Sequence, residues 1–237
     1  MADLPDLNQE NSYVRQYLKD WVKGIVQEYG FDGIRIDTIP EVEGQFWKEY
    51  GEASGVFQMG ECFNGDPAYV SPYQNDITAL FNYPMYYTIS DVFGSGKSMY
   101  QIRNRYNTED ADFQNVDLLG VFVDNHDNPR FLFNHKGQNA NLERAQVFAL
   151  TSRGIPFTYY GTEQYYGGGA DPANRESLWQ DFNTESSLYK MIATVHAQRK
   201  ASQIWKHEQV ERYVDDNFYA FSRGEFLVAL TNGNNTQ

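Results

Sequence analysis

The chain has 237 residues, with 19 Lys and Arg against 32 Asp and Glu, which gives a formal net charge of −13. This acidity argues against nucleic acid as a partner and against attachment to a membrane through basic residues. Charged residues make up 22% and aromatic residues 16%, which is typical of a folded chain rather than a disordered one. No stretch approaches the roughly 18 apolar residues of a membrane span.

The first half of the chain alternates predicted helices and strands. Apolar residues at spacings of three and four predict an amphipathic helix over 12–29, with Ser12 as its N-cap and Gly30 as its stop. Further strands are expected at 33–37, 56–59 and 79–81, and further helices at 46–50, 85–93 and 99–106.

The second half continues the alternation and then changes. The apolar run 118–123 is bounded by polar residues, as in a buried parallel strand. It is followed by a predicted helix at 142–152, a strand at 155–160 and a helix at 188–202. Strand–helix alternation with buried strands predicts a parallel α/β sheet. After residue 204, close-spaced strands at 210–214, 218–222 and 226–231 predict a β-meander that begins a second domain.

Three acidic residues lie at the ends of predicted strands: Asp37, Glu61 and Asp127. In a (β/α)₈ barrel the carboxyl ends of the strands form the active-site face, so these side chains are expected on one rim. Two carboxylates suffice for glycoside hydrolysis, one as acid and one as nucleophile or base. The alternative is that each acid caps the helix that follows it.

The residues next to these acids favour a catalytic role over a helix-capping role. Arg35 lies two residues before Asp37, so strand alternation puts both side chains on one face, where the guanidinium keeps the carboxylate ionised. His126 adjoins Asp127 inside the polar run 124–128, directly after a buried strand. Such a density of polar groups is costly unless the groups bind something.

These motifs resemble those of the α-amylase family. Gly33-Ile34-Arg35-Ile36-Asp37-Thr38, Gly60-Glu61 and Asn125-His126-Asp127 are similar to the family's motifs at barrel strands 4, 5 and 7, in the family's order. The resemblance is to fungal-type secreted α-amylases in particular and continues through 65–69, 81–84, 161–164 and 171–176. It implies the C-terminal part of a (β/α)₈ TIM barrel, strands 4–8, followed by the start of an all-β domain.

The resemblance also implies roles for single residues. Asp37 would be the nucleophile that forms a covalent glycosyl-enzyme, Glu61 the acid and then the base, and Asp127 the carboxylate that holds the distorted sugar. The substrate-binding residues would be Arg35, His126, Tyr83, Asp171 and Arg175.

A structural calcium ion is implied by the same resemblance. Asp6, in the segment Leu4-Pro5-Asp6-Leu7-Asn8, would be one ligand, and the backbone carbonyl of Glu41 another. Calcium takes six to eight oxygen ligands, so these two do not complete a site. Where the family often has Lys-His after the nucleophile motif, this chain has Pro40-Glu41, so a contact on the leaving-group side is expected to be lost.

The sequence thus predicts the end of an inserted calcium-binding domain over 1–11, a partial catalytic barrel over 12–203 and the start of a β-sandwich over 204–237. The expected function is endo-acting, retaining hydrolysis of α-1,4-glucosidic bonds in starch- or glycogen-type glucans. The alternatives are an α-glucosidase or transglycosylase of the same family, a non-catalytic binding subunit, and an inactive fragment. We expect an α-glucan partner, no nucleic acid or membrane, a monomer when complete, and secretion with the signal peptide outside this chain.

Overall fold

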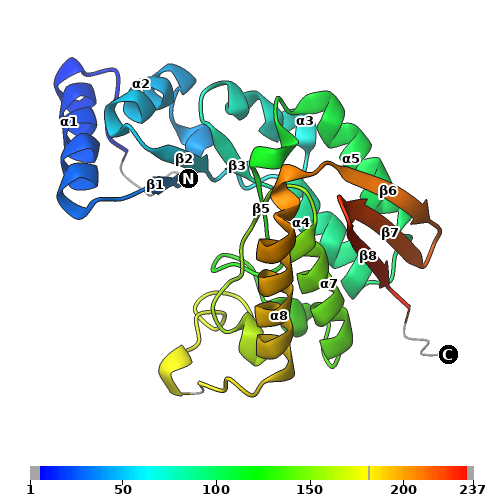
Figure 1. The fold of residues 1–237 in the computed structure, drawn as a ribbon. Helices are drawn as coiled ribbons and strands as arrows, with labels where there is room; N and C mark the ends of the chain where they lie inside the picture. Colours follow the sequence, from blue (N-terminus) through cyan, green and yellow to red (C-terminus); the bar gives the residue numbers. More distant parts are fainter. Residues whose placement is uncertain (1–5, 181, 234–237) are drawn as a thin grey trace. The chain divides into compact units, whose positions relative to one another are not determined.

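The computed structural model describes residues 6–180 and 182–233, and it forms two compact units (Figure 1). The first unit comprises Met1–Phe81 with Asp112–Gln114, and the second comprises Asn82–Ala111 with Asn115–Gln237. Within the described residues, no helix is long and apolar enough to span a bilayer. The predicted three-domain division remains a prediction.

The first helix, α1, runs over Ser12–Tyr29 as predicted, but its N-cap is Asn11 and not Ser12. Asn11 has an extended backbone, and its side-chain oxygen accepts the N–H groups of Tyr13 and Val14, so Ser12 becomes the first helical residue. Gly30 ends the helix in the left-handed region at φ 65°, which confirms the predicted stop.

The first unit pairs three short parallel strands in the order of the chain. They are β1 (Gly33–Ile36), β2 (Phe57–Gly60) and β3 (Ala79–Phe81). The connections contain η1 (Ile39–Glu41), α2 (Gly44–Ser54), α3 (Pro67–Val70) and η2 (Ser71–Asn75). Helix α2 is longer than the predicted 46–50, and α1 packs against it (Figure 1).

A small core fixes the turn between β1 and α2. Ile39, Phe46 and Trp47 are buried, and the indole N–H of Trp47 donates to the Ile39 carbonyl at 2.9 Å. This bond satisfies both groups away from water and ties the start of α2 to the chain just beyond β1. This core therefore holds in place the segment that follows the carboxyl end of β1.

The second unit contains two further parallel strands, β4 (Leu119–Val121) and β5 (Ile155–Pro156), with Gly120 opposite Ile155. Strand β5 is shorter than the predicted 155–160. It ends at Pro156, and Phe157, the next residue, donates its backbone N–H to the Val121 carbonyl at 2.8 Å. Helices of this unit are α4 (Tyr83–Ile89), π-helix η3 (Ser90–Gly94), α5 (Tyr100–Asp112), η4 (Val116–Leu118), α6 (Phe131–Asn134), α7 (Asn139–Thr151), η5 (Thr162–Gln164), η6 (Leu178–Gln180), α8 (Ser187–Ser202) and η7 (Ile204–Lys206).

The predicted meander is confirmed as an antiparallel sheet of β6 (Gln209–Val214), β7 (Phe218–Arg223) and β8 (Phe226–Thr231) (Figure 1). It shares a hydrophobic core with the helices of the second unit. Phe148 of α7 lies 6.5 Å from Tyr219 and 6.3 Å from Phe221 between ring centroids. The meander therefore supports the helix that connects β4 and β5.

Candidate active site

Asp37 directly follows β1 and Glu61 directly follows β2, and these two strands are paired in the sheet of the first unit. Ile36 of β1 lies opposite Gly60 of β2 in the parallel register, so the next residue of each strand carries an acid. The carboxyl ends of parallel strands meet at one edge, and this register places the two predicted catalytic acids at that edge.

Arg35 contacts Asp37, as strand alternation predicts. A guanidinium nitrogen of Arg35 forms an ion pair with the Asp37 carboxylate, and the two side chains are 37% and 64% exposed. The ion pair fixes the orientation of the Asp37 carboxylate at the end of β1.

Glu61 is almost fully buried, at 5% exposure, and its carboxylate accepts the backbone N–H of Thr38 at 3.0 Å. The backbone of Glu61 also donates to the Ile36 carbonyl at 2.8 Å and accepts the Ile39 N–H at 3.0 Å. Thr38, a β-branched residue, holds φ 46° at this point. Such strained conformations cost about 1–3 kcal/mol and cluster at active sites.

Cys62, next to Glu61, is a free and fully buried thiol. Burial, and then the Glu61 charge, raise the pKa of this thiol to about 12. It therefore stays protonated and unreactive at neutral pH.

Asp127 lies in a tight polar turn of the second unit, and Asn125 organises that turn. The side-chain oxygen of Asn125 accepts the backbone N–H groups of Asp127 at 3.1 Å and Asn128 at 2.9 Å. Its amide nitrogen donates to the Tyr83 hydroxyl at 2.9 Å. Tyr83 is 2% exposed, so it supports the turn from within the second unit.

Asp124 starts the same polar run but is buried and structural. Its carboxylate accepts the Phe131 N–H at 2.7 Å and the Thr162 hydroxyl at 2.9 Å. Burial raises the pKa of Asp124, and these two donors lower it in part. Asp124 therefore closes the loop that carries Asp127.

Four of the predicted residues form one charged cluster in the second unit. His126 Nε2 lies 3.3 Å from an Asp127 oxygen, and Arg175 Nη2 lies 3.7 Å from the other. Arg175 Nε contacts Asp171 at 2.9 Å and donates to the His126 carbonyl at 3.3 Å. The side chains of His126, Asp127, Asp171 and Arg175 are 38–54% exposed, so a polar ligand can reach them.

The structure thus brings the predicted residues together in two groups. Arg35, Asp37 and Glu61 meet in the first unit. The other predicted site residues, Tyr83, His126, Asp127, Asp171 and Arg175, belong to the second. That both groups form one site remains a prediction.

Helix capping does not account for the three acids. The N-cap of η1 is Thr38, one residue after Asp37, and the N-cap of α6 is Arg130, three residues after Asp127. The Glu61 carboxylate accepts the backbone N–H of Thr38, across the two strand ends.

The two predicted calcium residues do not make a metal site by themselves. Asp6 and Glu41 are both exposed, and among the described residues no group of three His, Cys, Asp or Glu could hold a metal ion. Calcium needs more oxygen ligands than these, so no step of the chemistry is assigned to it here.

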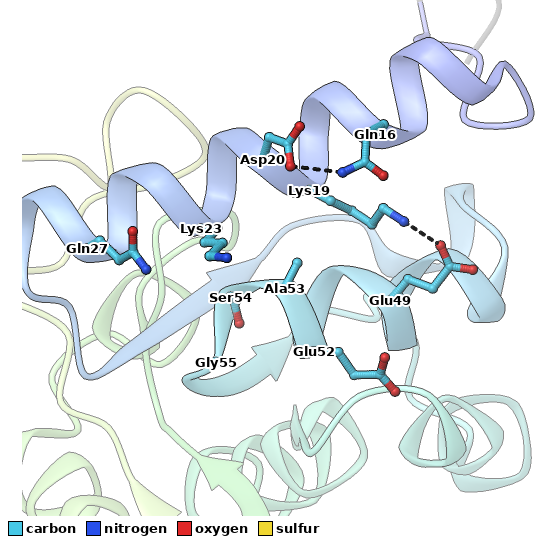
Figure 2. A pocket seen from close by; sticks show the side chains of 10 residues that line it. All are labelled: Gln16, Lys19, Asp20, Lys23, Gln27, Glu49, Glu52, Ala53, Ser54 and Gly55. Carbon is cyan, nitrogen blue, oxygen red and sulfur yellow. Dashed lines mark hydrogen bonds and ion pairs between the residues drawn. The ribbon is translucent and has the colours of Figure 1, made fainter.

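A polar hollow lies between α1 and α2 (Figure 2). Lys19 reaches across it to Glu49 at 3.0 Å, and Gln16 bonds to Asp20 along α1 at 2.8 Å. Its lining contains none of the predicted site residues. We therefore assign it no part in the chemistry.

Two buried residues that hold the Asp127 turn were missed by sequence reasoning. Arg130 and Asn174 are both 0% exposed, and Asn174 contacts the backbone on either side of Asp127. For Asn174 the signal was its place in the segment 171–176, whose resemblance to the family gave roles to Asp171 and Arg175 alone. Arg130 lies outside the motifs that carry the resemblance.

Comparison with known proteins supports the resemblance. Residues 1–222 match the family described as "Alpha amylase, catalytic domain". The chain is 44% identical to a "Beta/alpha-amylase" of Paenibacillus polymyxa over 100% of this chain and 21% of that protein. It is 38% identical to "Alpha-amylase 2" of Schwanniomyces occidentalis, over 100% of this chain and 46% of that protein.

A solved structure with the same fold is an α-amylase from Malbranchea cinnamomea. It has a TM-score of 0.92 and 36% identity, over 97% of this chain and 50% of that chain. The likeness confirms the predicted fold, the C-terminal part of a (β/α)₈ barrel followed by the start of an all-β domain. The chain spans half or less of the length of these relatives.

Proposed function

The chain belongs to the α-amylase catalytic-domain family, and from that premise we propose that this protein hydrolyses α-1,4-glucosidic bonds in starch- or glycogen-type glucans. We propose endo-acting cleavage with retention of configuration at the anomeric carbon. The observation that carries the proposal is the strand register that sets Asp37 and Glu61 side by side, with Arg35 on Asp37.

In the first step Asp37 attacks the anomeric carbon and Glu61 protonates the departing glycosidic oxygen, which gives a covalent glycosyl-enzyme. In the second step Glu61 takes a proton from water, and the water displaces Asp37. Each displacement inverts the anomeric carbon, so the two together retain its configuration. The Arg35 ion pair supports the nucleophile's role, since it holds the Asp37 carboxylate in a fixed orientation.

The charged cluster of the second unit would bind the sugar. Asp127 would accept hydroxyl hydrogens of the distorted ring, and His126 would contact the same sugar. Asp171 and Arg175 would bind the chain on the glycone side. Their partial exposure and mutual contacts support this, because exposed carboxylates held by a cation and an imidazole are suited to directional bonds with hydroxyl groups.

Several finer statements belong to the same proposal. We expect a structural calcium ion with Asp6 and the Glu41 carbonyl among its ligands, a monomer when complete, and action outside the cell. The acidic chain supports a neutral polyhydroxyl substrate over a polyanion.

The experiment compares two proteins on a soluble α-glucan. One is the 237-residue chain. The other, which we call the completed chimera, places this chain at its aligned position in the Malbranchea cinnamomea α-amylase, of which it covers 50%. We expect the chimera to release reducing sugars from internal bonds, with α-anomeric products by NMR.

Each alternative gives a different result. Transfer products longer than the substrate would indicate a transglycosylase, and release of glucose from chain ends would indicate an α-glucosidase. Activity of the chimera without activity of the 237-residue chain would identify an inactive fragment. Sugar binding without cleavage by a folded chimera would indicate a binding subunit and contradict the proposal.

A further inference from the structure

Arg130 places a positive charge in the interior of the second unit. The side chain is 0% exposed and is the largest of the fully buried side chains. Its Nε donates to Glu176 at 2.7 Å, while Nη1 and Nη2 have no hydrogen-bond partner among the described residues. A buried charge with unmet hydrogen bonds costs several kcal/mol.

Aromatic rings enclose this guanidinium. Its central carbon lies 4.4 Å from the ring centroid of Tyr159, and 5.4 Å from those of Tyr160 and Tyr166. Cation–π attraction offsets part of the desolvation cost. An apolar residue would fill this space at lower cost, so stability alone does not explain an arginine here.

Glu176, the ion-pair partner of Arg130, closes the loop formed by residues 168–176. We call this loop the strap. Glu176 uses its second oxygen to accept the Gly168 N–H at 2.7 Å, and Arg130 donates its own backbone N–H to the Gly168 carbonyl at 3.0 Å. A Cβ at Gly168 would lie 1.9 Å from the Ala173 carbonyl oxygen, so only glycine permits this approach.

The strap is fastened to the backbone on both sides of Asp127. The amide nitrogen of Asn174 donates to the His126 carbonyl at 2.8 Å and to the Asn128 carbonyl at 2.9 Å. Arg175, the next residue, contacts the Asp127 carboxylate. The peptide that carries Asp127 is thus fixed at the residue before it and the residue after it.

We propose that Arg130, Glu176 and Asn174 are positioning residues that lock the strap onto the Asp127 turn and so set the geometry of Asp127 and Arg175. The inference rests on the proposed function for its effect on catalysis. Arg130 and Asn174 are too deeply buried to touch a sugar, and they act through Asp127 and Arg175. Groups that stabilise a transition state must be held to within a fraction of an ångström, and a misplacement of 1 Å can cost about 100-fold in rate.

The first measurement uses the 237-residue chain and does not depend on activity. Asp127 and Asn128 donate their backbone N–H groups to Asn125, so hydrogen exchange at these amides reports the closure of the turn. We expect Arg130→Met to speed exchange at both amides at least about tenfold, beyond any change in global stability. Arg130→Lys keeps the charge beside Glu176 and should restore part of the protection.

The second measurement takes kcat and KM of the completed chimera. Arg130→Met and Glu176→Gln should lower kcat about 100-fold with KM changed less than about threefold, because ground-state binding depends less on exact placement. Arg153→Met is the matched control. Arg153 pairs with Asp110 and Asp117 elsewhere in the second unit, so its loss should lower stability alone.

Each outcome decides the proposal. Unchanged exchange at Asp127 and Asn128, or a kcat loss no larger than that of Arg153→Met, would overturn it. If Arg130→Met does not fold, Asn174→Leu removes the two carbonyl contacts and should give the same exchange and kcat effects. If the parent chimera is inactive, the proposed function fails, and the exchange data alone decide whether Arg130 positions the turn.

Discussion

The backbone N–H of Thr38 donates to the Glu61 carboxylate at 3.0 Å, and this bond joins the ends of the two strands that carry the proposed nucleophile and acid. Glu61 is thereby oriented by the residue that follows Asp37. The two acids form a unit whose geometry is set by one strand pair, Ile36 opposite Gly60.

Glu61→Gln should abolish starch cleavage by the completed chimera while leaving sugar binding intact. Glutamine keeps the shape and can still accept the Thr38 N–H, but it cannot cycle a proton. Loss of a general acid–base group typically costs about 10²–10⁴-fold in rate. The check is kcat on starch beside the dissociation constant for a maltooligosaccharide. The control is Glu52→Gln, at a residue that lines the hollow between α1 and α2. It should leave both kcat and the dissociation constant unchanged. Full activity of the Glu61 variant would show that another residue is the general acid.

Gly168→Ala should disable the strap without touching the charged cluster directly. The added methyl group would meet the Ala173 carbonyl at 1.9 Å, so the strap must move away from the Asp127 turn. We expect kcat of the chimera to fall more than about tenfold. Gly96→Ala, in open space at φ 68°, is the control for strain of a glycine replacement. Equal rates for the two variants would argue against a role for the strap.

Burial raises the pKa of Glu109 to about 7 from its usual 4.5, with Asn82 and Arg105 lowering it in part. Between these values the unfolded chain loses the proton while the folded chain keeps it. The free energy of unfolding therefore falls as pH rises from about 4.5 to 7, by about 3 kcal/mol in total. Glu109→Gln should remove this slope.

Urea unfolding of the 237-residue chain at pH 5 and pH 8 measures the effect of Glu109. Glu185→Gln, at a side chain 77% exposed, is the control and should keep the parent slope. A Glu109→Gln protein with the same loss of stability between these pH values as the parent would show that another group titrates.

Arg15 ties α1 to α2 through Glu43 at 2.6 Å and Glu49 at 2.9 Å. The hydrogen bond from Arg15, followed by that from Lys19, holds the pKa of Glu49 well below its usual range. Arg15→Gln should lower the thermal midpoint of the first unit at low salt, and by less in 1 M salt, since exposed pairs are screened. Lys23 lines the same hollow with no ion pair among the described residues, so Lys23→Gln should have little effect. The central guanidinium carbon of Arg15 also lies 5.4 Å from the ring centroid of Phe46, so a loss independent of salt would point to this packing instead.

The sequence predicted the strand–helix order because apolar periodicity is a local property. The error at the start of α1 has a local cause too, because Asn11 competes with Ser12 for the N-cap. The strand-end acids were predictable because a motif carries each one. The contact of Arg130 with Glu176 was not, because the two residues lie 46 positions apart and a motif does not say which side chains meet in the fold.

The most direct test of the central claim is to trap the sugar on Asp37. The chimera with Glu61→Gln is treated with α-maltosyl fluoride, whose fluoride leaves without an acid, and is then digested for mass spectrometry. Formation of the intermediate is spared, while its hydrolysis needs Glu61 as base, so the adduct should accumulate. The account predicts one maltosyl group on the peptide that contains Asp37, and none after Asp37→Asn. A sugar on another residue, or turnover to β-anomeric products with no adduct, would contradict it.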